Sequence, residues 1–199
     1  MHKLAELNTP IFWAEGHPGS LQRENWQIAV TGCCAHPRIF SWQDLLALPQ
    51  REVTSRLTSV TRWSVEGLWR GIPLAEILQV VQVSESCSYV RFWSINEIYD
   101  TSIPIAIARK EKSLLAYSFD GEFLTEDYGG PVRAFIPYLW GYKSAKCVVK
   151  IELMDYYVPG FWEKRGYTDS GEIEAGKCRD LNDGGKIKYI PAGEVLKFN

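Results

Sequence analysis

Residues 114–137 read LLAYSFDGEFLTEDYGGPVRAFIP, and this stretch decides the fold class. Two apolar runs, residues 114–119 and 123–124, flank Asp120-Gly121, a dipeptide typical of a tight β-hairpin turn. A glycine-rich turn follows at residues 128–131, and then the apolar run 132–136. Short strands joined by tight turns therefore predict a β-rich fold in this part of the chain.

Short strands and a few helices are predicted on both sides of this stretch. Alternating or β-branched apolar residues predict strands at residues 26–32, 57–60, 89–95, 101–105 and 146–153. One short helix is predicted after Ser41, with Asp44 completing a capping box, and it is expected to end before Pro49. A second is predicted from Leu74 to Val81, with Pro73 at its start. This pattern predicts an α+β fold with mixed short β-sheets and few short helices.

The composition predicts one domain with flanking segments. We expect an N-terminal arm at residues 1–25 on the surface, a domain at residues 26–167 and a C-terminal tail at residues 168–199. The tail is predicted to be loosely packed, because residues 168–188 are rich in Gly, Asp, Glu and Lys.

Charge and hydropathy exclude several classes of protein. The 22 Lys and Arg residues nearly balance the 24 Asp and Glu residues, so nucleic acid is not expected as a partner. No apolar run approaches the about 20 residues that a membrane helix needs. The first residues lack the pattern of a signal peptide, which predicts a cytoplasmic protein. The 5 cysteines are odd in number and irregular in spacing, and they do not predict a disulfide framework.

Two polar clusters are candidate sites for chemistry. In the first, Ser59 and Arg62 lie in a turn between aromatic residues, and an arginine there can bind phosphate or carboxylate. In the second, Gly141 precedes Lys143, Ser144 and Lys146, a set of ammonium and hydroxyl groups that suits an anionic oxygen cluster. From spacing alone, a surface turn with an arginine stacked on tryptophan and a solvated basic turn remain alternatives.

The order of these clusters resembles a known family. Six segments resemble, in the same order, the sulfite oxidase-like, molybdopterin-binding oxidoreductase domain: residues 32–46, 59–74, 114–124, 128–137, 141–146 and 160–167. The resemblance covers roughly residues 26–167, and it implies that family's fold. It also implies a pterin-dithiolene cofactor that holds molybdenum, and two-electron oxygen-atom transfer on a small-molecule substrate.

The resemblance also implies roles for individual residues. The phosphate of the pterin is expected at Lys143, Ser144 and Lys146, next to Gly141. Arg133 and Arg62 match positions near the pterin and its anionic groups. The family's metal-binding cysteine falls at Ser59, so Ser59 is the expected metal ligand, and Ser59 and Arg62 are the candidate catalytic residues.

The serine at position 59 leaves several functions open. Ser59 could ligate molybdenum as a harder donor than thiolate, or it could be an engineered replacement. The chain could also bind the pterin without normal catalysis. Alternatively, it could have lost the cofactor and act as a cofactor-free enzyme or a small-molecule binding protein on the same scaffold. A further alternative is a partner subunit that docks through exposed aromatic residues such as Trp162.

Overall fold

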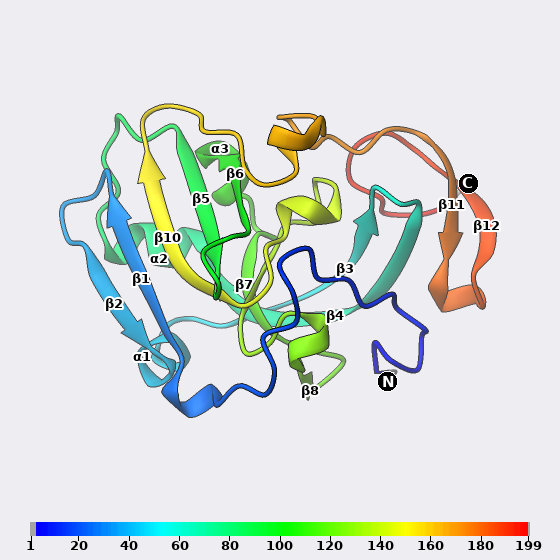
Figure 1. Cartoon of the computed structure of the whole chain (residues 1–199), viewed down its shortest axis with the longest axis horizontal. Helices are drawn as coiled ribbons and strands as arrows, with labels where there is room; N and C mark the ends of the chain where they lie inside the picture. The colour runs from blue at the N-terminus through cyan, green and yellow to red at the C-terminus, as the bar shows by residue number, and fades with distance from the viewer. Residues whose placement is uncertain (1–2, 199) are drawn as a thin grey trace.

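Two β-sheets share the buried core in a computed structural model that describes residues 3–198 (Figure 1). The first sheet has 5 strands in the order β2-β1-β10-β5-β6. Their bounds are Arg38–Ser41 for β2, Gln27–Gly32 for β1, Val148–Met154 for β10, Tyr89–Ser94 for β5 and Asp100–Pro104 for β6. β1 and β10 are parallel, and the other neighbours are antiparallel.

The second sheet has 7 strands, with β12-β11-β4-β7-β8 in one path, β3 on β4 and β9 on β7. The bounds are Arg51–Ser59 for β3, Trp63–Pro73 for β4, Leu114–Phe119 for β7, Glu122–Phe123 for β8, Arg133–Phe135 for β9, Gly176–Asp180 for β11 and Lys186–Ile190 for β12. β3 runs antiparallel to β4 from Arg51 opposite Gly71 to Ser59 opposite Trp63. This register places Ser59 at the turn that joins the two strands.

The helices are short. The α-helices are α1 (Trp42–Ala47), α2 (Leu74–Val80) and α3 (Ile105–Ala108), and the 3-10 turns are η1 (Arg23–Asn25), η2 (Glu126–Tyr128), η3 (Gly141–Lys143), η4 (Glu163–Arg165) and η5 (Leu181–Asp183). The predicted capping box is present, because Ser41 Oγ accepts from Asp44 N and the Asp44 carboxylate accepts from Ser41 N. The predicted hairpin at Asp120-Gly121 is also confirmed. No helix in the described part of the chain is long and apolar enough to cross a membrane.

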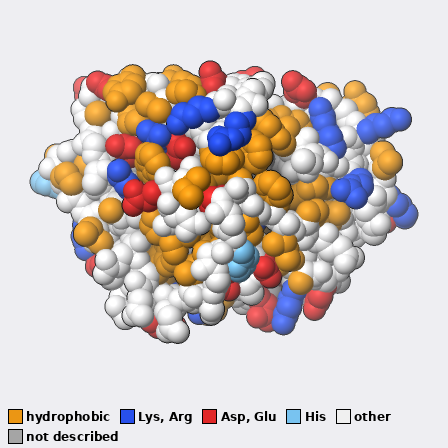
Figure 2. Space-filling view, in the orientation of Figure 1, with side chains coloured by type: hydrophobic (Ala, Val, Ile, Leu, Met, Phe, Trp, Pro, Cys, Tyr) orange, Lys and Arg blue, Asp and Glu red, His pale blue; other side chains and the backbone are white. Residues whose placement is uncertain are grey.

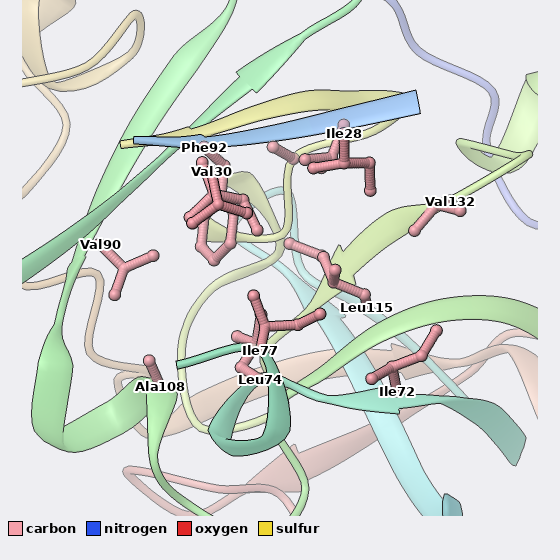
Figure 3. Close-up of a cluster of buried hydrophobic side chains, with 14 of the residues drawn as sticks. Ile28, Val30, Ile72, Leu74, Ile77, Val90, Phe92, Ala108, Leu115 and Val132 are labelled. Carbon is pink, nitrogen blue, oxygen red and sulfur yellow. The ribbon is translucent and has the colours of Figure 1, made fainter. Parts of the chain in front are cut away.

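The main core lies between the first sheet and α2. Figure 3 shows Ile28 and Val30 of β1 facing Ile77 of α2, with Phe92 of β5 beside them. A second cluster lies around Trp69 of β4, which stacks on Phe135 of β9 with 4.3 Å between ring centroids. Because Arg133 begins β9, this stacking fixes the backbone that carries Arg133.

The C-terminal segment corrects the prediction of a loosely packed tail. β11 and β12 form an antiparallel hairpin, and β11 pairs in parallel with β4 at Trp63 and Ser64. Ile173, Cys178 and Ile190 are almost fully buried there. The composition is polar because β12 is an edge strand that turns most of its residues to solvent, and Figure 2 shows Lys and Arg side chains gathered at this end of the molecule.

Candidate functional site

A cavity of about 440 Å³ lies where segments from both halves of the chain meet. Its size falls within the about 300–1,000 Å³ typical of pockets for small molecules and cofactors. Its walls come from the β3–β4 turn, the segment around η3, the aromatic residues near η4 and the N-terminal segment. The lining residues used below are Thr9, Phe12, Trp13, Glu15, Ser59, Arg133, Gly141, Ser144, Lys146 and Trp162.

Gly141 shows that the two predicted clusters converge. A Cβ added at Gly141 would lie 3.4 Å from Thr58 O and 3.7 Å from Ser59 Cα. The start of η3 therefore lies directly against the end of β3. The chain segments of Ser59 and of Ser144 and Lys146 line one cavity, although they are about 85 residues apart in sequence.

Arg133 is a buried cation in the cavity wall. Its guanidinium donates to Tyr128 O at 2.7 Å and to Ser144 O at 3.1 Å. Burial lowers the pKa of Arg133 to about 10, so the group stays protonated at neutral pH. Within residues 3–198 it forms no ion pair with a carboxylate. Its hydrogen bonds go to backbone carbonyl groups, and it lies 5.8 Å from the ring centroid of Trp69.

Lys146 places a second cation beside Arg133. Its ammonium donates to Phe12 O at 2.9 Å and to Asp127 O at 2.8 Å. It also lies 4.6 Å from the ring centroid of Trp13, a cation–π contact. Burial and then the positive charge of Arg133 lower the pKa of Lys146 to about 7.

The balance of charge in the wall favours an anionic guest. Glu15 is the one carboxylate among the described lining residues, and it forms no ion pair with either cation there. Placing two cations in a partly desolvated wall is unfavourable unless an opposite charge joins them. The cavity therefore favours a ligand that carries anionic oxygen.

Ser59 offers an oxygen atom to the cavity at the end of β3. Its hydroxyl lies 2.8 Å from Thr61 Oγ1 and accepts from Thr61 N at 3.2 Å. Neither cysteine nor histidine is among the described residues that line the cavity. No group of three potential metal ligands occurs within residues 3–198. The described lining residues thus present hydroxyl groups to the cavity and no thiolate.

The structure places Arg62 outside the cavity lining. Its guanidinium lies 4.9 Å from the ring centroid of Trp140 and donates to Glu174 O at 2.9 Å. Arg62 also has φ of 62°, a left-handed conformation in the turn between β3 and β4. It holds the C-terminal segment against the β3–β4 turn, which its sequence position did not reveal.

Lys143 also points away from the cavity. Its ammonium is fully buried in an ion pair with Glu163, and it donates to Ser102 O at 3.0 Å. The cause is the 3-10 turn η3, in which successive side chains point in directions about 120° apart. Tyr142 and Ser144 line the cavity, while Lys143 between them enters the core.

Several lining residues were missed by sequence reasoning. The N-terminal residues 9–15 were expected on the surface as part of an arm, but they form one wall of the cavity. Trp162 was an alternative docking residue, yet it lines the cavity and packs on Tyr167 at 4.9 Å between ring centroids. No local pattern marks these residues, because their position depends on contacts far apart in sequence.

Comparison with known proteins decides the family. The sequence model of the family described as "Oxidoreductase molybdopterin binding domain" matches residues 15–162. The chain belongs to this molybdopterin-binding oxidoreductase family. The predicted fold, a sulfite oxidase-like α+β domain, is confirmed.

Curated relatives and a solved structure agree with this family. The chain is 35% identical over 148 residues to the "Uncharacterized oxidoreductase YuiH" of Bacillus subtilis, covering 74% of each protein. It is 30% identical over 161 residues to the methionine-sulfoxide reductase catalytic subunit MsrP of Ralstonia nicotianae, covering 73% of this chain and 49% of MsrP. The crystal structure of the sulfane dehydrogenase SoxCD from Paracoccus pantotrophus matches with a TM-score of 0.66 and 17% identity, covering 89% of this chain and 46% of that chain, which supports the fold.

Proposed function

We propose that this chain binds a molybdopterin cofactor in the cavity and acts as an oxidoreductase that transfers an oxygen atom to or from a small substrate. The observation that carries the proposal is the pair Arg133 and Lys146, two cations without an ion-pair partner in the described part of the chain. This pair fits a ligand that carries anionic groups.

Each wall of the cavity has a proposed part in binding. Lys146 and Ser144 would hold the terminal phosphate, and Gly141 places the start of η3 against the end of β3 beside them. Arg133 would neutralise anionic groups of the pterin. When bound, the molybdenum centre supplies two-electron oxygen-atom transfer. Lys143 is proposed to make no contact with the ligand. Its ion pair with Glu163 fixes the position of η3 and therefore that of Ser144.

Ser59 is the proposed metal-facing residue. Its hydroxyl lies at the end of β3 and already accepts from Thr61 N, which would support negative charge on the oxygen. An oxygen donor is harder than a thiolate, so a metal held there would be bound less covalently. We expect Ser59 to weaken metal retention relative to a cysteine at the same position.

A second function is favoured by the absence of a soft donor among the described lining residues. On this alternative, the chain binds an anionic small molecule through Arg133 and Lys146 and holds no metal. Both functions use the same anion-binding wall. They differ in whether pterin and molybdenum accompany the purified protein.

Purification from a host that synthesises the cofactor tests the proposal. Pterin released from the protein is measured by fluorescence after oxidation, and molybdenum by mass spectrometry. We expect stoichiometric pterin in the wild type, a large loss in Lys146→Gln, and no loss in the matched variant Lys150→Gln, whose lysine lies on β10 near Glu152. Folded wild-type protein with neither pterin nor molybdenum would refute the proposal and favour the alternative.

A further inference from the structure

The N-terminal wall of the cavity lies largely outside the family match. We call residues 9–15 the strap; the family match begins at residue 15. Figure 1 shows the N-terminal chain crossing the front of the molecule between the two sheets. Every strap residue lines the cavity. The strap therefore lies almost wholly outside the residues that the family model matches.

The strap occupies the position at Lys146 that an anionic ligand needs. An ammonium group has three N–H donors. Phe12 O and Asp127 O each accept a hydrogen bond from the Lys146 ammonium. The ring centroid of Trp13 lies 4.6 Å from the same ammonium and covers its remaining side. An incoming anionic oxygen must replace a contact, and both contacts outside the Asp127 backbone belong to the strap. A bond from the ammonium to an anionic oxygen joins two opposite charges, whereas the bond to Phe12 O joins a charge to a carbonyl dipole, so this exchange is favourable.

The strap is held weakly. Among the described residues, its backbone makes one hydrogen bond to another backbone group, from Thr9 N to Leu4 O at its start. Thr9 Oγ1 and Trp13 Nε1 are buried without partners, which destabilises the closed arrangement. The Phe12 side chain is 61% exposed and contacts Trp162 at 6.0 Å between ring centroids. Segments with few backbone hydrogen bonds and few buried contacts open at low free energy.

We propose that the strap is a displaceable lid whose Phe12 carbonyl and Trp13 ring hold the place of a phosphate-type oxygen at Lys146. Entry of the ligand removes both contacts and opens the strap. The inference rests on the proposed function for the anion site itself. The inference adds that the strap competes with the ligand for Lys146 and is not a fixed wall of the cavity.

Competition between the strap and the ligand predicts that weakening the strap increases the affinity for the ligand. A ligand that binds only the open form has an apparent affinity reduced by the fraction of protein that is open. Phe12→Ala removes the ring contact to Trp162 and keeps the backbone carbonyl. We expect this variant to bind inorganic phosphate about three- to tenfold more tightly than the wild type. A fixed wall would give weaker or unchanged binding, and Phe123→Ala, another exposed phenylalanine on β8, is the matched control.

Fluorine NMR on full-length, cofactor-free protein provides the measurement. The protein is labelled with 5-fluorotryptophan and titrated with inorganic phosphate, and calorimetry records binding independently. Trp13 is assigned with Trp13→Phe, and Trp93, which lies on β5 and does not line the cavity, serves as the reference signal. We expect the Trp13 signal to move with the same phosphate dependence as the binding heat while the Trp93 signal stays unchanged.

The outcomes separate the lid from the site. Phosphate binding that leaves the Trp13 signal unchanged, or that weakens in Phe12→Ala, overturns the lid and leaves the anion site intact. Absence of phosphate binding in both the wild type and Phe12→Ala overturns the anion site and the lid together. Binding that is lost in Lys146→Gln and tightened in Phe12→Ala supports both.

Discussion

Replacing Lys143 with methionine should destabilise the fold rather than remove a ligand contact. The ammonium of Lys143 and the carboxylate of Glu163 are both fully buried. Glu163 Oε1 also accepts from Thr101 Oγ1 at 2.8 Å, while Glu163 Oε2 has no hydrogen-bond partner. Without the lysine, the carboxylate is left in the core with one hydroxyl donor. Removing one partner of a buried ion pair costs about 3–5 kcal/mol.

This cost should be visible by chemical and thermal denaturation of the cofactor-free protein. In a domain of this size, 1 kcal/mol corresponds to about 2–4 °C in Tm, so we expect Lys143→Met to lower Tm by roughly 6–20 °C. Lys164→Met is the matched control, because Lys164 is exposed on the neighbouring turn η4. Surface substitutions of this kind usually change stability by less than about 0.5 kcal/mol.

A second variant separates the ion pair from general damage to the core. Lys143→Met combined with Glu163→Gln removes the charge on both sides and keeps an acceptor for Thr101. We expect the double variant to recover at least about 2 kcal/mol of the loss, because a buried pair can often be replaced as a unit at little cost. A Lys143→Met protein with wild-type stability but no phosphate binding would refute this reasoning, and it would restore the role that the sequence predicted for Lys143.

Three further predictions concern Lys146, Ser59 and Arg62. The pKa of Lys146 is lowered to about 7 from the ordinary value of 10.5, so from pH 7 upwards the unfolded state binds a proton that the folded state has released. The free energy of unfolding of the wild type, measured by urea denaturation, should therefore rise between pH 7 and 9 relative to that of Lys146→Met. A difference between the two proteins that stays the same from pH 7 to 9 would contradict this. Ser59→Cys should raise the molybdenum content of protein that carries pterin; an unchanged metal content, with pterin present, would count against Ser59 as the metal-facing residue. Arg62→Ala should increase hydrogen exchange in β11 and β12 and leave phosphate affinity unchanged, because Arg62 binds the C-terminal segment and not the cavity; weaker phosphate binding would show that Arg62 reaches the ligand after all.

The sequence predicted the elements that depend on neighbouring residues. The capping box of Ser41 and Asp44 and the hairpin turn at Asp120 and Gly121 each need only a few residues to form, and both are present. The convergence of the two polar clusters on one cavity required the resemblance to a family, since no spacing rule relates Ser59 to Lys146.

The features that sequence reasoning missed depend on tertiary contacts. β12 buries one of its five residues, Ile190, so its composition resembles that of a loop. The strap has no periodic pattern, because it is held by Lys146 and Tyr128 from distant segments and by aromatic contacts. The direction of the Lys143 side chain depends on how the three-residue turn η3 is rotated against the core. The neighbouring residues in the sequence do not determine that rotation.

Pterin content compared between variants tests the central claim most directly. The wild type, Lys146→Gln and Lys150→Gln are purified side by side from a host that makes the cofactor, and the released pterin is measured per folded chain. The account predicts stoichiometric pterin in the wild type and in Lys150→Gln and little in Lys146→Gln. Equal pterin in all three proteins, or none in the folded wild type, would contradict the claim that the wall formed by Arg133 and Lys146 binds the cofactor.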